Sequence, residues 1–439
     1  MLNIGTEIED FVGDLVSGSF FADFTIRSPK YTKSNQEKEA VDILVLFEDT
    51  LIGIQVKSKW VDLADGEMTE VENNRVAKTI TKATAQFRAL KDALQRESFK
   101  EFTNGRGFPM PFDRSKISKV HLIVVAAFIP RDPAEEPPRL IFQHPPGEYH
   151  ELLHFFDLLT FQNLLQILDT LPDFVNYLDT SGALRTAGLV PTSASPADVW
   201  AKMTFEKESL ANRLKREPQP SVGDSGSAEP PTHVVADPLG LTRCAERYIE
   251  DTERLEAEEQ EGYLIDQFIE HLHETIGSGD YPQTLLEKIP NQIAPPGSVE
   301  AYQRMIPFLA RLNRFQRTEL AKQILIRLER IRDGEPLTFG GVQFDDRSVA
   351  YVFSASKGFT RHQRLAAAIK LSRAIGSRYA AEWVIGLSLG VTVSGDFSIE
   401  SVVADLRGDV LEPELVEWAD KYVGDRYWRD AEAAKPSPQ

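Results

Sequence analysis

The stretch that decides the fold is AVDILVLFEDTLIGIQVKSK, Ala40–Lys59. Two apolar runs flank the polar pair Glu48 and Asp49, which suits a tight turn, so the stretch predicts a β-hairpin. Successive strand residues point to opposite faces, so Ile52, Ile54 and Val56 share the core side of the second strand. The other side carries Gly53, Gln55, Lys57 and Lys59. Because that side gathers an amide and two ammonium groups where apolar residues would complete the pattern, we expect a functional site there.

The position of the turn decides which residue lies opposite Asp42. A turn at Glu48 and Asp49 places Asp42 across from Gln55, with Cβ atoms about 5 Å apart. A turn at Asp49 and Thr50 places Asp42 across from Lys57, on the same face. In both registers a carboxylate, an amide oxygen and an ammonium converge on one patch.

The elements around the hairpin predict an α/β domain. An i, i+4, i+7, i+8 apolar pattern from Ile4 to Val16 indicates a helix, and Phe21–Ser28 reads as a strand. A polar loop over residues 30–38 leads into the hairpin. A long amphipathic helix is expected over Asn73–Arg96, followed by a buried strand over Lys119–Phe128. The core face of that long helix is expected to consist of Val76, Ile80, Ala83, Phe87, Leu90 and Leu94.

The converging side chains suit hydrolysis of a phosphodiester with a hard divalent cation. Mg²⁺ is bound in proteins by one or two carboxylates and keeps several waters. Asp42 supplies a carboxylate and Gln55 a neutral oxygen, while Lys57 would stabilise developing phosphorane charge or orient the attacking water. The first helix offers a further acid. Glu7 and Glu9 flank its apolar stripe, and geometry alone does not choose between them.

The order helix, three strands, helix, strand, with these acids and a Gln-x-Lys on the third strand, resembles the PD-(D/E)XK nuclease superfamily. The likeness is to its restriction-endonuclease-like, resolvase and Mrr-like branches, and it covers about residues 1–130. In resolvase-like members the helix acid follows a Gly by four positions, as Glu9 follows Gly5 here.

The resemblance implies an αβββαβ mixed-sheet core and a Mg²⁺-dependent DNA endonuclease, with Mn²⁺ as a substitute and a role in prokaryotic defence against foreign DNA. It makes Glu9, Asp42 and Gln55 metal ligands and Lys57 the catalytic lysine. This hypothesis requires Glu9 and Asp42 to converge, and it requires Gln55 to stay outside the apolar interior.

A basic segment supports a DNA partner within an acidic chain. The formal net charge is −18, yet Asn73–Lys119 holds 11 basic and 4 acidic residues. On the long helix a polar stripe flanks the core face and would meet phosphates. The expected DNA-contacting residues are Arg75, Lys78, Thr79, Lys82 and Gln86, together with Lys59 on the hairpin.

The rest of the chain predicts a second domain. We expect the nuclease-like domain with trailing helices to span residues 1–185, a Pro/Ser/Gly-rich linker 186–238, and a mainly helical α+β domain 239–439. The trailing helices include one that starts near Tyr149. We expect the second domain to bind a protein partner or to form a homo-oligomer.

Two other functions compete with the nuclease. HELLH, His150–His154, matches the H-E-x-x-H motif of zinc peptidases, in which His150 and His154 bind zinc from one helix face and Glu151 is the general base. The second alternative is a catalytically inactive DNA-binding or scaffold protein.

The composition predicts a cytoplasmic protein without a membrane partner. Only one cysteine is present, so no intramolecular disulfide can form, as is usual in a reducing compartment. The longest apolar runs are far too short to span a bilayer.

Overall fold

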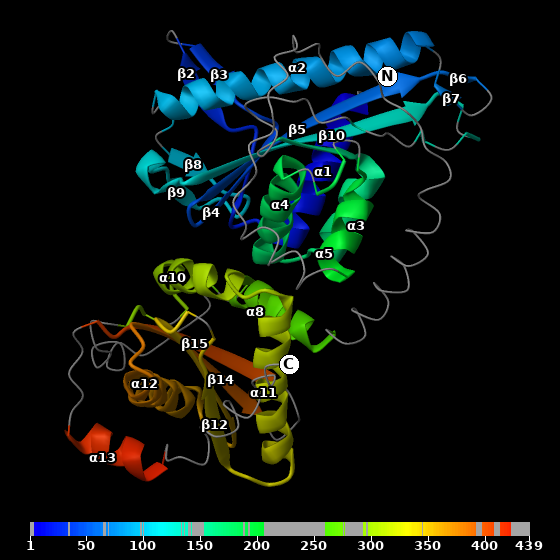
Figure 1. Ribbon diagram of the computed structural model, residues 1–439. Coiled ribbons are helices and arrows are strands. Elements are labelled where there is room, and N and C mark those ends of the chain that lie inside the picture. The colour runs from blue at the N-terminus through cyan, green and yellow to red at the C-terminus, as the bar shows by residue number, and fades with distance from the viewer. Residues whose placement is uncertain are drawn as a thin grey trace. The chain divides into compact units, whose positions relative to one another are not determined.

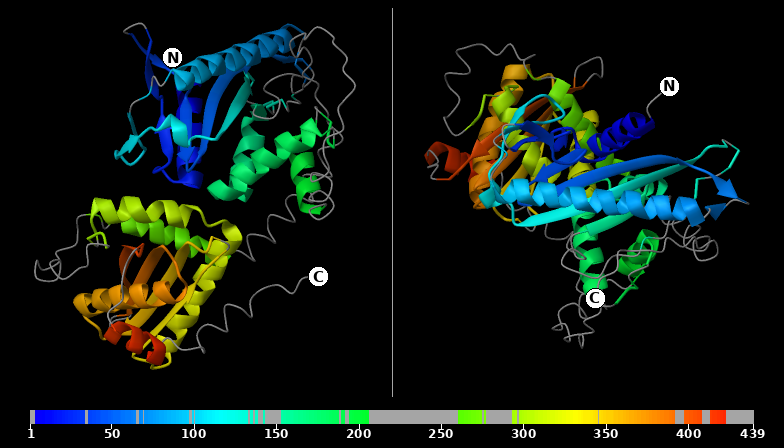
Figure 2. Two further views of the ribbon diagram at one scale, coloured as in Figure 1. Left: turned by 60° about the vertical axis from the view of Figure 1, so that its left-hand side comes forward. Right: turned by 90° about the horizontal axis from the view of Figure 1, so that it is seen from above.

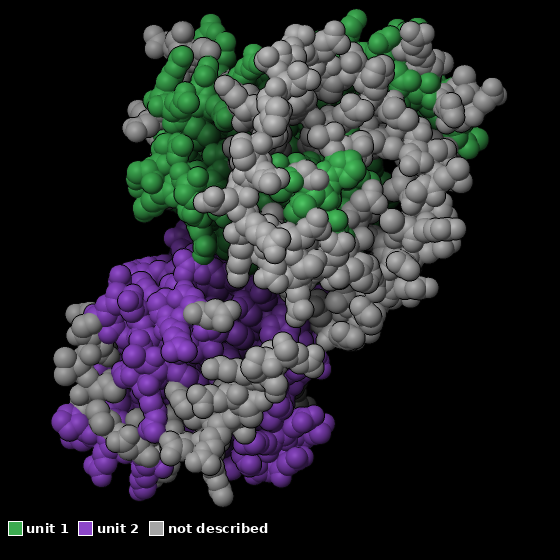
Figure 3. Space-filling model, in the orientation of Figure 1, with its two compact units in different colours: residues 1–255 green, residues 256–439 purple. Residues whose placement is uncertain are grey.

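The computed structural model divides the chain into two compact units, residues 1–255 and 256–439 (Figure 3). It describes residues 4–205 and 260–422, except for 34–35, 65–66, 69, 97–98, 100, 133, 136, 139–141, 143–152, 188, 192–193, 275, 277–292, 296, 345, 392–396 and 408–412.

A five-stranded mixed sheet forms the centre of the first unit (Figure 1). Its order is β1 (Thr25–Arg27), β4 (Ile43–Phe47), β5 (Thr50–Val61), β10 (Lys119–Pro130) and β11 (Leu153–Asp157). The first three strands pair antiparallel, whereas β10 runs parallel to both β5 and β11. The structure therefore shows the predicted α/β class.

Helix α2 (Glu70–Gln95) covers one face of this sheet (Figure 1). All six residues predicted for its core face are buried in a cluster with Leu51, Leu122 and Val124 of the sheet. A Cβ on Gly53 would lie 2.8 Å from Leu90 Cδ2, so only glycine permits this close approach of the helix. Alternation along β5 then places Gln55 on the face that α2 covers.

Helices α1 (Ile4–Phe20), α3 (Leu158–Ile167) and α4 (Leu171–Thr186) cover the opposite face (Figures 1 and 2). The Phe20 ring of α1 packs 4.9 Å from that of Phe174 on α4. Both faces of β5 are thus covered, which explains why its residues are buried from Thr50 to Val56.

Several short elements differ from the prediction or add to it. The expected polar loop forms a hairpin, and the helix expected from Tyr149 begins instead as strand β11, with α3 only after Asp157. α5 lies inside the expected linker, most of which is outside the described residues. The remaining elements are β2 (Lys30–Lys33), β3 (Gln36–Glu39), β6 (Leu63–Ala64), β7 (Glu67–Met68), β8 (Glu101–Thr103), β9 (Pro109–Pro111), η1 (Arg114–Lys116) and α5 (Pro196–Phe205).

The second unit is built on a four-stranded sheet, in the order β12 (Leu337–Val342), β13 (Val349–Lys357), β14 (Trp383–Val391) and β15 (Phe397–Asp405). This unit therefore contains more sheet than the mainly helical domain that the sequence predicted. Its helical elements are η2 (Gln260–Gly262), α8 (Tyr263–Glu274), α10 (Val299–Ala310), α11 (Arg314–Arg332), α12 (Arg361–Arg378) and α13 (Pro413–Tyr422).

Candidate functional site

The β4–β5 hairpin fixes the position of Asp42. Ile43 pairs with Ile54 and Phe47 with Thr50, so Glu48 and Asp49 form the turn. Asp42 then lies one residue beyond the last pair, next to Gln55, as in the first of the two predicted registers. The local cause is the position of the two-residue turn, because a turn at Glu48 and Asp49 permits only one pairing of the strands on either side.

Asp42 is held by contacts to β5. Its Oδ2 accepts a hydrogen bond from the Val56 backbone N–H at 2.6 Å and lies 3.8 Å from Lys57 Nζ. The Gln55 side chain also hydrogen-bonds to this carboxylate. Lys57 Nζ in turn donates to the Val56 carbonyl at 2.9 Å. Both side chains retain some exposure, 11% for Asp42 and 20% for Lys57.

Helix α1 brings Glu9 to the same end of the hairpin. Arg27 pairs with Ile43 in the sheet, and its guanidinium binds Asp14 at 2.5 Å and Asp10 at 3.9 Å, so this part of α1 lies against the end of β4. Burial and the nearby Asp42 carboxylate raise the pKa of Glu9, while Lys57 opposes the rise. Glu9 and Asp42 are therefore near enough to interact electrostatically, and their convergence on one metal ion stays a prediction.

Burial also affects Asp42 itself. Desolvation raises the pKa of Asp42, although the Lys57 ammonium and the Val56 N–H favour its ionised form. A carboxylate whose charge is disfavoured in this way gains from a cation beside it.

Gln55 is buried, whereas the hypothesis required it to stay outside the apolar interior. Its side chain is 1% exposed, because α2 covers this face of β5. It contacts Asp42 and orients that carboxylate, so contact between its carbonyl oxygen and a metal would need a local opening. The alternation of side chains along β5 had suggested that Gln55 lies on a polar face open to solvent. The packing of α2 over Gly53 is the tertiary feature that the pattern did not contain.

Glu39 is an acid near Asp42 that the sequence reasoning did not consider. It ends β3 and is exposed. Burial of its carboxylate and the nearby Asp42 raise the pKa of Glu39, and Lys57 lowers it. The only sequence indication was its place three residues before Asp42, in a segment expected to be a loop.

The predicted DNA-contacting residues lie largely on the outer face of α2. Arg75, Lys78, Lys82 and Gln86 are exposed, and Arg75 also binds Glu72 at 2.5 Å. Lys59 is partly buried on β5, two residues after Lys57. The exposed residues of α2 and Lys59 on β5 therefore remain candidates for phosphate contacts.

The helix required by the zinc-peptidase motif is not observed over the described part of HELLH. His154 lies on strand β11 and is 1% exposed, while His150 and Glu151 are outside the described residues. His154 Nε2 lies 3.4 Å from Nδ1 of His121, whose Nε2 faces Asp179 Oδ1 at 3.2 Å. A strand cannot place residues four apart as a helix turn does, so the i, i+4 zinc geometry has no support here.

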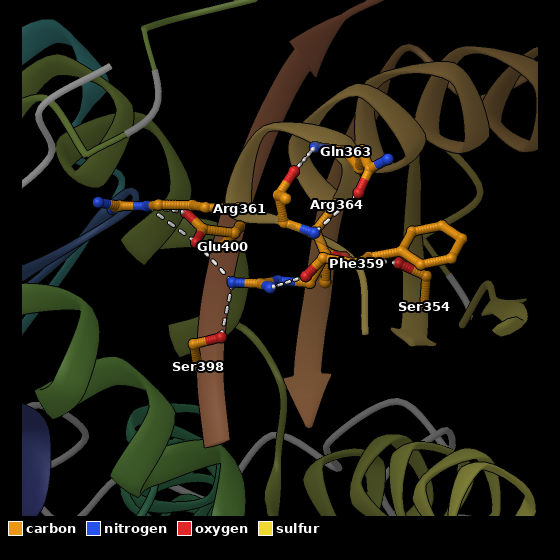
Figure 4. A network of polar contacts seen from close by, with 9 residues as sticks. Ser354, Phe359, Arg361, Gln363, Arg364, Ser398 and Glu400 are labelled. Atoms are coloured by element: carbon orange, nitrogen blue, oxygen red, sulfur yellow. Dashed lines mark hydrogen bonds and ion pairs between the residues drawn. The ribbon is translucent and has the colours of Figure 1, made fainter. Parts of the chain in front are cut away.

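The arginines at the start of α12 form an internal network in the second unit (Figure 4). Glu400 has a side chain 2% exposed, and its two oxygens accept from Arg361 Nε at 2.9 and 3.1 Å. Arg364 Nη2 lies 3.4 Å from the same carboxylate and donates to Ser398 Oγ at 2.7 Å. These arginines thus fasten α12 to β15.

Known proteins provide no assignment for this site. Neither family models, nor curated proteins, nor solved structures match the chain.

The donor set in the first unit suits a hard cation. The carboxylates of Asp42 and Glu9 carry oxygen ligands of the kind that Mg²⁺ prefers. Within the described ranges, no group of three His, Cys, Asp or Glu is already close enough to hold a metal ion. Mg²⁺ is commonly held by one or two carboxylates, waters and substrate phosphates, so two acids would suffice.

Among the residues that the structure describes, no helix has the length and apolar character needed to cross a membrane.

Proposed function

We propose that the chain is a Mg²⁺-dependent DNA endonuclease whose site lies at the open end of the β4–β5 hairpin. The observation that carries the proposal is the approach of the Lys57 ammonium to within 3.8 Å of the Asp42 carboxylate; Glu9 is near enough to interact electrostatically with both groups. Acids and an amine at one partly exposed spot are the groups that phosphodiester hydrolysis needs.

In this proposal Asp42 and Glu9 hold the cation. When bound, it would polarise the scissile phosphate and lower the pKa of a coordinated water. Lys57 Nζ lies 3.8 Å from Asp42 Oδ2, so Lys57 would stabilise the developing charge on the phosphate or orient the attacking water. Gln55 keeps the Asp42 carboxylate in place.

The exposed basic side of α2 would contact the DNA backbone. Arg75, Lys78 and Lys82 present cations along one helix, and Gln86 adds a hydrogen-bonding group. Such contacts fix the position of a duplex without reading its sequence. A role for the second unit in homo-oligomer formation or partner binding stays a prediction.

The test is nicking of supercoiled plasmid in Mg²⁺. We expect nicking by the wild type, and we expect EDTA or Lys57→Ala to lower the rate by about 10²-fold or more, the effect typical of losing a group that stabilises transition-state charge. Lys116→Ala is the matched control, because Lys116 is 77% exposed on η1; its rate should equal that of the wild type.

Two outcomes would contradict the proposal. Equal nicking by Lys57→Ala and wild type would exclude Lys57 from the chemistry. Intact plasmid with a salt-sensitive mobility shift would indicate a DNA-binding protein without nuclease activity.

A further inference from the structure

One edge of β5 is open beyond the candidate site. β4 pairs with β5 only over Thr50–Ile54, whereas β10 pairs with it as far as Val61. Figure 1 shows β5 and β10 continuing together past β4 as a two-stranded ribbon. Among the described residues, no strand pairs with the other edge of β5 from Gln55 onward.

The candidate site occupies the first position of this open edge. The Val56 N–H donates to Asp42 Oδ2 at 2.6 Å, and the Val56 carbonyl accepts from Lys57 Nζ at 2.9 Å. Backbone groups alternate in direction along a strand, so the next groups on the same side belong to Ser58 and Trp60. In the described part of the chain, no hydrogen bond engages these groups on the open side.

This short edge does not suit pairing with a strand of another protein chain. A typical strand has about 5–6 residues, whereas only two residues present open groups here. Lys57 and Lys59 lie beside these groups, and lysines at an edge oppose such pairing. The next acid along the chain, Asp62, is already paired with Arg131 at 3.1 Å. The charges at this edge therefore favour a polyanion as the partner.

Trp60 presents a large aromatic surface at the same edge. It is 43% exposed, and among the described residues no aromatic ring or cation packs on its indole. Single exposed apolar side chains are common on protein surfaces. This one, however, lies only three residues from Lys57, which is about 10 Å along a strand.

The ring and the two lysines lie on opposite faces of the ribbon. Successive strand residues alternate between faces, so Trp60 is on one face while Lys57 and Lys59 are on the other. In a nucleotide the phosphate and the base also extend in different directions from the sugar. A DNA strand that follows the edge can therefore place phosphates near the lysines and one base on the indole.

Stacking on an indole requires a base whose face is uncovered. In a continuous duplex the neighbouring bases cover both faces, and protein side chains reach only the base edges in the grooves. Taking a base out of the duplex costs free energy, and this cost is least where the base is already unpaired. Trp60 therefore favours DNA that contains unpaired nucleotides.

We propose that Trp60 and Lys59 bind an unpaired segment of the DNA strand next to the cleavage position. Trp60 stacks on a base, and Lys59 contacts a phosphate. The inference rests on the proposed function, because it names the substrate class of the same site: DNA with a single-stranded segment. Lys57 then meets the scissile phosphate, and Trp60 meets a nucleotide beside it.

The test is fluorescence anisotropy of the full chain with labelled oligothymidylate and, separately, with a labelled duplex. Both titrations are made in EDTA at low salt, so that binding is measured without cleavage. Trp60→Ala should weaken oligothymidylate binding about tenfold or more, the loss typical of removing one stacking platform. Its affinity for the duplex should equal that of the wild type. Leu159→Ala is the control, because Leu159 is 57% exposed on α3; it should bind both DNAs as the wild type does.

Two further variants separate stacking from a structural role. Trp60→Phe and Trp60→Leu both keep an apolar side chain, but only phenylalanine offers a ring to a base. Trp60→Phe should therefore bind oligothymidylate more tightly than Trp60→Leu, even if both variants unfold at a lower temperature than the wild type. Equal oligothymidylate affinity of these two variants, wild-type affinity of Trp60→Ala, or an equal loss for both DNAs would overturn the inference.

The inference and the proposed function can fail separately. If oligothymidylate binds in a Trp60-dependent way and plasmid stays intact in Mg²⁺, the nuclease proposal fails while the binding role of Trp60 stands. If plasmid is nicked in a Lys57-dependent way and Trp60→Ala binds oligothymidylate normally, only the role of Trp60 is wrong.

Discussion

Gly53 allows the most direct test of how α2 is placed over the site. A Cβ at this position would lie 2.8 Å from Leu90 Cδ2, 3.5 Å from Val41 Cγ1 and 3.6 Å from Leu122 Cδ2. Only the Leu90 contact is closer than real side chains tolerate, and Leu90 is fully buried. Gly53→Ala must therefore displace the end of the Leu90 side chain within the packed layer between α2 and β5.

The size of the effect follows from two opposing contributions. Overpacking of a well-packed core costs about 1–3 kcal/mol. Replacing glycine within a strand recovers about 0.5–1 kcal/mol of backbone entropy. We therefore expect Gly53→Ala to lower the free energy of unfolding by about 1–2 kcal/mol, which corresponds to about 3–6 °C in Tm for a unit of this size.

The assay is urea unfolding followed by circular dichroism, in a double-mutant cycle with Leu90→Ala. Leu90→Ala alone should cost about 2–5 kcal/mol, as for other buried leucines. In the Leu90→Ala background Gly53→Ala should no longer destabilise, because the clashing Cδ2 is gone; the coupling free energy should be about 1–2 kcal/mol.

A matched glycine checks the backbone contribution. Gly18 lies in α1 and has no heavy atom within 4 Å of an added Cβ. Gly18→Ala should stabilise the protein by about 0.5–1 kcal/mol. The packing argument would be refuted if Gly53→Ala were as stable as the wild type, or if its cost were unchanged in the Leu90→Ala background.

Two further predictions concern charges. Burial raises the pKa of both Asp42 and Glu9, so protons should compete with Mn²⁺ for these carboxylates and the Mn²⁺ affinity should fall as the pH drops through the raised pKa values. Calorimetry between pH 4.5 and 7 measures this dependence, and an affinity that does not change with pH would contradict the prediction. Without metal the sign for stability is opposite: the contribution of these acids is largest when they are protonated at low pH, and it is lost as pH rises through their folded pKa values. In the second unit, Glu400→Gln removes the carboxylate that pairs with Arg364, whose side chain is 9% exposed. The variant should lower the free energy of unfolding, measured in urea, by about 3–5 kcal/mol. Glu300→Gln removes an exposed i,i+4 pair and should cost about 0.5 kcal/mol or less; similar losses for the two variants would show that burial of the pair is unimportant.

Sequence predicted the features that depend on neighbouring residues. The apolar period of α2 is local, so its core face was predicted correctly. The two-residue turn limited the β4–β5 hairpin to two registers, and the structure shows one of them. Strand β11 was missed because the apolar run around His154 and Phe155 has no period that separates a fully buried strand from a helix.

The features that were missed depend on contacts between distant segments. Gln55 alternates with apolar residues along β5, which predicts a polar face, but its burial is decided by α2, which begins 15 residues later in the chain. The polar composition of residues 30–38 suggests a loop, but the segment pairs as the β2–β3 hairpin.

The burial of Gln55 has a physical explanation. An acid at position 55 would be buried at 1% exposure beside Asp42, where two like charges share a covered site and one must remain protonated. An amide at that position avoids this repulsion and still hydrogen-bonds to Asp42. A neutral side chain is therefore the partner of Asp42 that the face covered by α2 tolerates best.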